Sequence, residues 1–492
     1  MSDTPTLHQS GDNQNSLKSG VLGLFDSTIM GLAGSAPAYS IAATTTLLFG
    51  AVAYGGAAAL LYCGFFMFGI VFAFRYLSRA DDHAGASYSW VRKALHPVLG
   101  YLAGWSLVVC SLIFMVIATF PAGSSVLSLF SEKLASNTGW VTTFGCIFFL
   151  LMVGAVAAGV TVTVRVQITM TCIEVAVLVV FALLAIFHGH HVTHFSWAWF
   201  SPSIFHLPGG HGFNTSVFTS GALLAAFYYW GWDVTANLNE ETKDAKRNSG
   251  IGGILGTIII FGLYEVFTVA TNLVLTPAQL TDDKNAADIL QVLGQSVWHG
   301  TGGKLIVVAV LLSTVATLET QLIQVTRTMF AMGRDHTLPS ALGRTHEVRK
   351  TPLIATLVVA IFSVALFVGS SYLGSVNQIL QDGYSAIGLQ ICFYYGLAGL
   401  AVVAMYRKQL FKSVGNFIFM GLWPLLGSLF MGYVFVKVIP TLNNTTQWIG
   451  LGAMALGLVP MGYFYFVAKS PYFTMPPKSE RVITIEALEA NL

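Results

Sequence analysis

Charged residues are scarce in this chain of 492 residues. Lys, Arg, Asp and Glu together make up 9% of the sequence, whereas a soluble domain carries about 25%. Hydrophobic residues reach 55%, and the mean hydropathy is +0.70. A soluble protein of this size cannot hide that much apolar surface in its interior. The composition therefore predicts an integral membrane protein and excludes a soluble globular one.

The sequence also lacks a polar segment long enough to form a separate domain. The longest polar gaps are residues 188–215, residues 276–302 and the two ends, each at most about 30 residues, whereas an independent domain needs about 50. This excludes pumps that carry a nucleotide-binding domain. A net charge of +2 gives no reason to expect a nucleic-acid partner. The polar residues 1–19 contain no apolar run typical of a signal peptide, so none is expected.

Cysteine is rare as well, and nothing in the sequence indicates a metal or another cofactor. The five cysteines lie singly inside apolar stretches, so we expect them to pack as small apolar side chains. The histidines between His188 and His194 are expected to belong to a solvated loop rather than to a zinc site. The apolar stretches contain no pair of nucleophile and base, so no catalytic residues and no enzyme activity are expected.

Long apolar runs are abundant, and they predict an all-α protein with twelve membrane-spanning helices. The expected spans are residues 22–49, 53–77, 98–130, 140–160, 165–188, 216–238, 250–275, 303–331, 353–370, 377–404, 416–438 and 447–468. The expected organisation is an N-terminal tail at 1–20, five spans in 21–188, an extracellular loop at 189–215, five spans in 216–404, two more in 405–468, and a C-terminal tail at 469–492.

Basic residues are unevenly distributed among the loops between these spans. Of the 24 Lys and Arg residues, 20 fall on one side of the predicted membrane, and the four on the other side are Lys133, Lys284, Lys304 and Lys437. Positive charge is retained on the cytoplasmic side of a membrane protein. We therefore expect a protein of the plasma membrane with both termini in the cytoplasm.

Two of the predicted spans contain residues that interrupt a helix. Residues 31–37 of the first span include two glycines and Pro37, and residues 228–233 of the sixth span include Gly231. Proline has no N–H to donate, and glycine loosens the backbone. A single interruption can be a structural kink. Paired interruptions in corresponding helices of two halves, however, indicate the substrate site of a transporter.

Four segments of the sequence resemble the amino acid–polyamine–organocation (APC) transporters, in their amino acid permease branch. They are residues 31–40, 83–105, 229–243 and 327–339, and together they extend over most of the first ten spans. Gly34-Ser35-Ala36 stands where the family usually has Gly-Ser-Gly. The resemblance implies a LeuT-like fold of 5+5 inverted repeats plus two C-terminal helices, with the first and sixth helices broken.

The resemblance also implies where a substrate binds. In the family, N–H groups at the first break bind a substrate carboxylate, and carbonyls at the sixth-span break bind its amino group. A helix N-terminus carries partial positive charge, which suits an anion. Phe227 stands where family members often carry a gating aromatic, although simple packing is the alternative. The expected substrate-binding residues are Leu32, Gly34, Ser35, Ala36, Phe227, Trp230, Gly231 and Gln321.

Glu174 is an acidic residue deep inside the predicted fifth span. It lies nine residues after Arg165, or about 13 Å into the membrane at a rise of 1.5 Å per residue. Gln167 and Thr171 share its helix face. In some family members this position holds a Lys linked to proton coupling. A carboxyl group in apolar surroundings favours its neutral form and can carry a proton. We hypothesise that Glu174 binds a coupling proton, with a structural Glu as the alternative.

Two further acids lie within predicted spans. Asp233 follows the sixth-span break at an acidic position common in the family, and it either accepts backbone N–H groups or titrates during transport. Glu319 is about 200° around its helix from Gln321 at 100° per residue, so we expect it to contact another helix. The same helix carries a polar stripe that suits a substrate or water pathway, formed by Ser313, Thr317, Gln321 and Gln324.

The sequence as a whole predicts a secondary active transporter that imports an amino acid or related amine by alternating access. Proton symport is the first choice because Glu174 can titrate. Exchange of substrates and sodium symport are alternatives, the latter using span 1 carbonyls with the hydroxyls of Ser313, Thr314 or Thr317. A non-transporting membrane receptor on the same fold is the rival from another class. The expected partners are the small-molecule substrate, H+ as coupling ion and membrane lipid.

Overall fold

The computed structural model describes residues 16–207, 210, 212–282, 289–372 and 375–474. Within these residues the regular structure is helical, and no β-strand occurs. The outer parts of the two expected tails, residues 1–15 and 475–492, lie outside the described residues, as does Lys284.

The helices follow the predicted spans closely. In chain order they are α1 (Leu24–Ser35) with α2 (Pro37–Val52), α3 (Gly56–Ala80), α5 (Pro97–Ser128), α7 (Thr138–Ala158), α8 (Val160–Phe187), α9 (Thr215–Tyr228) with α10 (Val234–Asn237), α11 (Ala245–Val274), α14 (Thr301–Arg334), α15 (Leu353–Ser370), α16 (Val376–Met405), α17 (Val414–Asn416) with α18 (Trp423–Val438), and α19 (Asn444–Gln447) with α20 (Ala453–Leu456) and α21 (Leu458–Gly462). Short π-helical turns at Phe417–Leu422, Trp448–Gly452 and Tyr463–Val467 continue the last two spans.

Ten helical stretches in the described residues are long and apolar enough to cross a membrane. The first of them, Leu24–Ala80, contains two passes, one made by α1 with α2 and one by α3. The shorter apolar helix α9 makes a further pass together with α10. The twelve predicted spans and the all-α fold class are therefore confirmed. The two largest boundary shifts are at the starts of α8 and α11, which begin at Val160 and Ala245 instead of 165 and 250. α8 begins there because Gly159, with a φ of 126°, separates it from α7.

Shorter helical segments connect the spans. They are α4 (Ser87–Ala94), α6 (Glu132–Ala135), α12 (Pro277–Thr281), α13 (Ile289–Val297), α22 (Pro471–Thr474), and 3-10 turns at Ala53–Gly55, Trp197–Phe200, Pro202–Ile204, Asn239–Glu241, Ser340–Gly343, Leu410–Lys412 and Ile439–Thr441.

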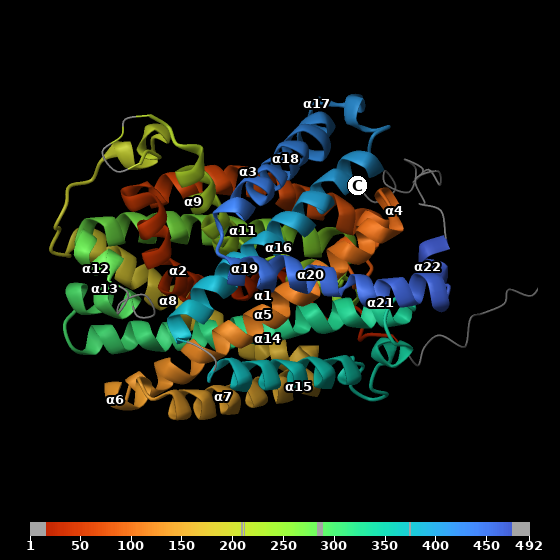
Figure 1. Cartoon of the computed structure of the whole chain (residues 1–492), viewed down its shortest axis with the longest axis horizontal. Helices are drawn as coiled ribbons and strands as arrows, with labels where there is room; N and C mark the ends of the chain where they lie inside the picture. The colour runs from red at the N-terminus through yellow and green to blue at the C-terminus, as the bar shows by residue number, and fades with distance from the viewer. Residues whose placement is uncertain (1–15, 208–209, 211, 283–288, 373–374, 475–492) are drawn as a thin grey trace, which may run out of the picture.

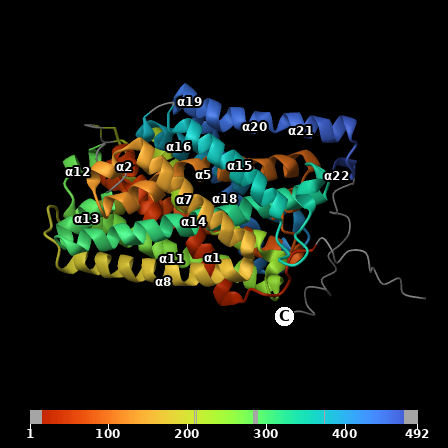
Figure 2. The ribbon, with the colours of Figure 1, turned by 90° about the horizontal axis from the view of Figure 1, so that it is seen from below.

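Most of the long helices run roughly along one axis of the molecule (Figure 1). α14 is central to the bundle, since it packs against α5, α8, α1 and α2. α19, α20 and α21 form one edge when the molecule is turned (Figure 2). This arrangement places both interrupted spans against α14.

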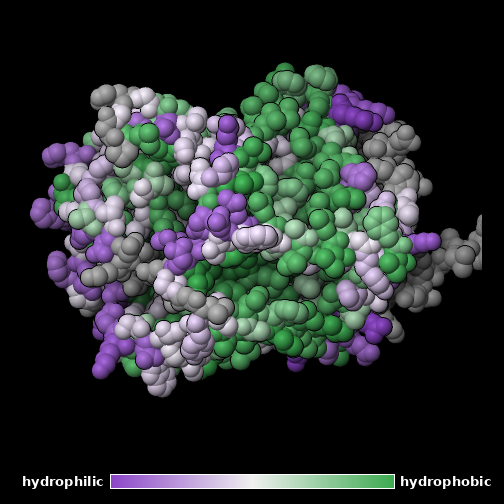
Figure 3. Space-filling model, in the orientation of Figure 1, coloured by the Kyte–Doolittle hydropathy of each residue, from purple (hydrophilic) through white to green (hydrophobic). Residues whose placement is uncertain are grey.

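The surface is apolar over the middle of the bundle, as expected for a protein surrounded by lipid. Figure 3 shows hydrophobic residues over much of this face, with hydrophilic residues gathered mainly toward its two ends. Large apolar side chains point outward from the spans, including Leu151, Ile361 and Phe466, which are 67%, 68% and 73% exposed. Outward apolar side chains at this density are typical of a lipid-facing surface.

Candidate functional site

The first span is broken at Ala36. α1 ends at Ser35, Ala36 adopts the left-handed conformation with φ 47° and ψ 66°, and α2 begins at Pro37. Proline suits the first position of a helix because it has no N–H to leave unpaired. The left-handed conformation costs a residue with a Cβ about 1 kcal/mol. The chain thus holds a locally unfavourable conformation at the predicted break.

The sixth span is broken over residues 229–233. α9 ends at Tyr228, α10 begins at Val234, and Gly231 between them has a φ of 100°, which favours glycine. The broken first and sixth helices that the sequence predicted are therefore confirmed.

The two breaks pack directly against each other. A Cβ added to Gly34 would overlap the carbonyl of Gly231, and a Cβ added to Gly231 would overlap the carbonyl of Gly34. The Cβ added to Gly231 would also lie 2.9 Å from the Gln321 amide nitrogen. Glycine is therefore required at both positions for this close approach of the two backbones.

The N-terminus of α2 binds side chains from two other spans. The Ala38 N–H donates to Glu174 Oε1 of α8 at 2.9 Å, and the Tyr39 N–H donates to Ser313 Oγ of α14 at 3.1 Å. A carboxylate at a helix N-terminus is favoured by the partial positive charge there. Glu174 is fully buried, and its second oxygen, Oε2, has no hydrogen-bond partner among the described residues.

The carbonyls of the first break bind side chains too. Thr317 of α14 donates its hydroxyl to the Gly34 carbonyl at 3.0 Å, and Tyr264 of α11 donates to the Ser35 carbonyl at 2.9 Å. Three spans distant in the sequence, α8, α11 and α14, therefore hold the first break in place.

The structure places the predicted anion-binding residues one turn before the α2 N–H groups that α8 and α14 engage. Gly34 and Ser35 belong to the last turn of α1, and the Ala36 N–H donates to the Ala33 carbonyl at 3.2 Å. Leu32 lies in α1 with its side chain buried. The engaged N–H groups are those of Ala38 and Tyr39, which the sequence did not single out because the register of the turn was not known.

Asp233 joins the sixth-span break to α16. The Tyr394 hydroxyl donates to Asp233 Oδ2 at 2.9 Å, and the indole N–H of Trp230 donates to the Tyr394 oxygen at 2.7 Å. Asp233 stands at the N-cap of α10 but makes no side-chain capping bond there. Tyr395 and Gln324 also face its carboxylate, yet neither reaches hydrogen-bond geometry, and Asp233 Oδ1 has no partner in the described part of the chain.

Aromatic rings line the same region. The Phe227 ring lies 5.0 Å from the Tyr384 ring, and the Trp230 ring lies 5.4 Å from the Phe114 ring. The Tyr384 hydroxyl is in turn 3.1 Å from the Tyr39 hydroxyl. Rings from α5, α9 and α16 and the residues after α9 therefore surround the place where the breaks meet.

The polar stripe of α14 faces both breaks. Ser313 and Thr317 bind the first break, as described above, and Gln321 and Gln324 are fully buried. Both polar atoms of each Gln side chain are without a partner among the residues described. A buried amide with nothing to bind is costly, so these two side chains mark a place where a polar ligand can bind.

Glu319 contacts another helix, as the sequence predicted. Its Oε2 accepts a hydrogen bond from the Gln167 side chain of α8 at 2.6 Å, and the same amide donates to the Ala316 carbonyl at 2.8 Å. Glu319 therefore joins α14 to α8 and does not lie at the breaks.

Five tyrosines of this site were missed in the sequence. They are buried within spans: Tyr39, Tyr264, Tyr384, Tyr394 and Tyr395. A buried tyrosine hydroxyl usually needs a partner, so tyrosines inside apolar spans were the available signal. The partners of Tyr39, Tyr264 and Tyr394 are distant in the chain and could not be identified from spacing.

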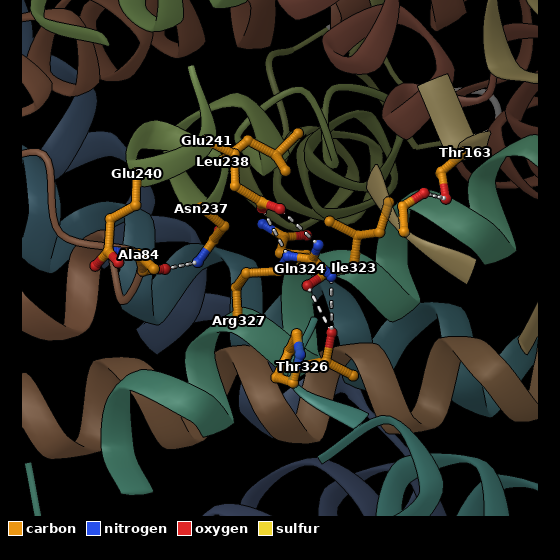
Figure 4. Close-up of polar contacts among 12 residues, drawn as sticks. Ala84, Thr163, Asn237, Leu238, Glu240, Glu241, Ile323, Gln324, Thr326 and Arg327 are labelled. Carbon is orange, nitrogen blue, oxygen red and sulfur yellow. Dashed lines mark hydrogen bonds and ion pairs between the residues drawn. The ribbon is translucent and has the colours of Figure 1, made fainter. Parts of the chain in front are cut away.

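A second polar cluster lies at the end of the bundle that the sequence predicted to be cytoplasmic, where Figure 4 shows Arg327, Glu241 and Asn237 close together. Arg327 of α14 makes two hydrogen bonds to the Glu241 carboxylate, at 3.0 and 3.1 Å, with both side chains fully buried. Asn237 donates to the Ala84 carbonyl at 2.8 Å and to Thr328 at 3.0 Å. These bonds tie the end of the sixth span to α14 and to the loop before α4.

Glu240 extends this cluster toward solvent. Its carboxylate accepts hydrogen bonds from Arg334 at 2.6 and 3.1 Å and from the Ala84 N–H at 2.9 Å. Burial by itself raises the pKa of Glu240, but the hydrogen bonds and the positive charge of Arg334 outweigh it and lower that pKa. The loop after the sixth span is therefore held by ionised pairs at neutral pH.

The start of the first span is also bound to this cluster. The Val21 and Leu22 N–H groups donate to the Glu241 carbonyl at 2.9 and 3.1 Å, and the Lys243 N–H donates to the Leu22 carbonyl at 2.8 Å. The ends of the first, sixth and eighth spans on this side of the bundle are thus bound together.

A family model described as "Amino acid permease" matches residues 22–459 of this sequence. The chain belongs to the amino acid permease family. The match extends over both breaks and over the cluster around Arg327 and Glu241, and it confirms the resemblance found in the four sequence segments. The permease is therefore a multi-pass membrane transporter rather than an enzyme.

The permease is similar to transporters with different substrates. It is 25% identical over 413 residues to the low-affinity putrescine importer PlaP of Escherichia coli (strain K12), with 80% of this chain and 82% of the relative covered. It is 24% identical over 409 residues to the methylthioribose transporter of Bacillus subtilis (strain 168), with 79% and 81% covered. It is 25% identical over 410 residues to the branched-chain amino acid permease BcaP of the same organism, with 79% and 81% covered.

Proposed function

We propose that the permease imports an amino acid or related amine by alternating access, with a proton as the coupling ion. The observation that carries this proposal is the bond between Glu174 of α8 and the N-terminus of α2 at the first break. A hydrogen bond to an ionised carboxylate is roughly twice as strong as one to a neutral group. Protonation of Glu174 therefore weakens the link between α8 and the half of span 1 beyond the break.

The surroundings of Glu174 support a role in binding a proton. Tyr264 of α11 is a titratable group that faces it, and the Ala38 N–H and the Ser313 hydroxyl are polar neighbours of its carboxyl group. Oε2 is available for the proton while Oε1 still accepts from Ala38. One carboxyl group can thus bind a proton and stay in contact with the break.

The proposed access route rests on a difference between the two ends of the bundle. The cytoplasmic end is held shut by the cluster around Arg327 and Glu241. A cavity of about 450 Å³ lies at the other end, between α2, α9 and α12, and is lined in part by Thr46, Ser216 and Ser220. We propose that substrate arrives from this side and leaves when the cytoplasmic cluster opens.

The proposal includes the organisation and the orientation of the chain. Residues 21–188 and 216–404 would be two inverted repeats that rock against each other, and both termini would be cytoplasmic in the plasma membrane. Cysteines introduced singly at the exposed Arg344 and Lys437 test the orientation. An impermeant thiol reagent applied from outside should label the cysteine at 437 and not the one at 344.

Uptake into proteoliposomes tests the proposal. Pools of labelled amino acids and amines are presented outside, with and without a pH gradient that is acidic outside. Accumulation that collapses with a protonophore is the expected result. Uptake that depends on preloaded substrate would favour exchange, and dependence on sodium would favour a site at Ser313 and Thr317. Binding without entry of any pool would contradict transport and favour a receptor.

A further inference from the structure

The N–H groups at the first break are all used within the described part of the chain. The first N–H groups of α2 bind Glu174 and Ser313. Pro37 has no N–H, and the N–H of Ala36 donates to the Ala33 carbonyl. A carboxylate brought by a substrate would therefore find no unpaired N–H here, because Glu174 already occupies the position of the anion.

Unpartnered polar side-chain atoms of the described chain, in contrast, lie where the breaks meet, and they include two carboxylate oxygens as well as neutral donors such as the indole N–H of Trp232. Asp233 Oδ1 and Glu174 Oε2 have no partner among the described residues, and neither do the Tyr395 hydroxyl and the amides of Gln321 and Gln324. All five side chains are fully or almost fully buried. The amides can donate or accept, so the two carboxylates decide which charge the site favours.

The site contains two buried carboxyl groups and, in the described part of the chain, no buried basic side chain to balance them. Arg327 is the one fully buried Lys or Arg side chain among the residues described, and Glu241 already engages it. No basic side chain therefore balances Asp233 and Glu174. Like charges brought together in a site of low dielectric repel strongly, whereas an ammonium group is attracted.

We propose that the substrate is a small organic cation, an aliphatic amine or diamine, that carries no carboxylate. The ammonium group binds at Asp233 with the amides of Gln321 and Gln324. Glu174 acts as a specificity-determining residue, since it fills the α2 N-terminus that a zwitterion would need. This inference rests on the proposed function and narrows its substrate class.

The walls of the site suit such a cation. The rings of Phe114, Phe227, Trp230 and Tyr384 lie together beside the breaks. Aromatic faces attract ammonium groups and also pack against methylene chains. An alkyl amine thus finds an acidic group at the sixth-span break and an apolar lining beside it.

Matched pairs that differ only by a carboxylate test the inference. The pairs are putrescine with ornithine, cadaverine with lysine, and agmatine with arginine, each labelled and offered to proteoliposomes that contain the full chain. The decarboxylated member of each accepted pair should show a kcat/KM about 10- to 100-fold higher. Leucine is included as a neutral amino acid, and it should not be transported.

The outcomes separate the substrate class from transport itself. Equal or better uptake of the amino acids, or uptake of leucine alone, would overturn the inference and leave the transporter in place. Uptake of none of these compounds, together with no thermal stabilisation of the purified protein by any of them, would overturn both.

Variants of Glu174 test its part in the preference. Glu174→Ala frees the Ala38 N–H and should reduce the preference for the diamine at least about tenfold by admitting the amino acid. Glu174→Gln keeps an acceptor for Ala38 and should show a smaller loss. Glu319→Gln is the matched control, because Glu319 is a buried carboxyl that contacts α8 and not the breaks. An unchanged preference in Glu174→Ala, measured on protein with a normal melting profile, would contradict the assignment.

Discussion

At the residue scale, the buried pair of Arg327 and Glu241 bears most directly on how the spans are held together at the end proposed to be cytoplasmic. Both side chains are fully buried, and two hydrogen bonds join them. A buried pair of this kind is not a large net source of stability, but removing one partner leaves an uncompensated charge. Each side chain of the pair therefore depends on the other to compensate its charge.

Replacing one residue of this pair should destabilise the protein more than replacing both. Arg327→Met is expected to destabilise the protein by about 3 to 5 kcal/mol, and the double variant with Glu241→Met by clearly less. Thermal unfolding in detergent measures this cycle. Arg334→Met is the control, because the Arg334–Glu240 pair is more exposed and should cost about 1 kcal/mol or less. A double variant less stable than either single variant would contradict this mutual compensation of charge.

The sequence predicted which acidic residues lie inside the spans better than it predicted which residues they bind. Glu174 and Asp233 were singled out because ionisable groups in apolar spans are costly. Their partners are Ala38, 136 residues away, and Tyr394, 161 residues away. Partners at such separations depend on how the helices pack, which one sequence does not give. The roles of all the predicted site residues in binding a substrate or a proton stay predictions.

At the element scale, the two broken helices form one unit. Each break could be predicted because glycine and proline have local backbone effects that need no tertiary contact. Their mutual contact follows from the fold, since the Gly34 and Gly231 backbones meet without any Cβ between them. Boundaries of uninterrupted spans were predicted less well, because an apolar run does not reveal where a turn such as the one at Gly159 falls.

Alanine at either glycine should prevent the two breaks from meeting. Gly34→Ala and Gly231→Ala are expected to lower uptake at least about tenfold, because each new Cβ would overlap a backbone carbonyl. Gly262→Ala on α11 is the matched control. No atom of the described chain lies within 4 Å of its added Cβ, and alanine favours a helix by about 1 kcal/mol over glycine. Uptake by Gly34→Ala or Gly231→Ala at the rate of the control variant would contradict the packing of the breaks.

At the scale of the whole molecule, composition and the apolar runs predicted the membrane class and the spans, and the family resemblance implied the LeuT-like fold. The 9% of charged residues and the long apolar runs fixed the membrane class, because lipid requires spans with internally satisfied backbones. The functional arrangement depends on a few polar contacts inside this bundle. Those contacts connect α8 and α14 to the first break and the sixth-span break to α16. We propose that a proton on Glu174 moves with the substrate through this arrangement.

Proton movement measured during substrate entry tests that claim most directly. Proteoliposomes carry a trapped pH-sensitive dye, the membrane potential is clamped with potassium and valinomycin, and a transported amine is added outside without any pH gradient. If Glu174 carries the proton, the wild-type protein and Glu319→Gln should acidify the interior as substrate enters, whereas Glu174→Gln should move substrate with little or no acidification. Substrate entry through the wild-type protein without any change of internal pH, or full acidification by Glu174→Gln, would contradict this role of Glu174.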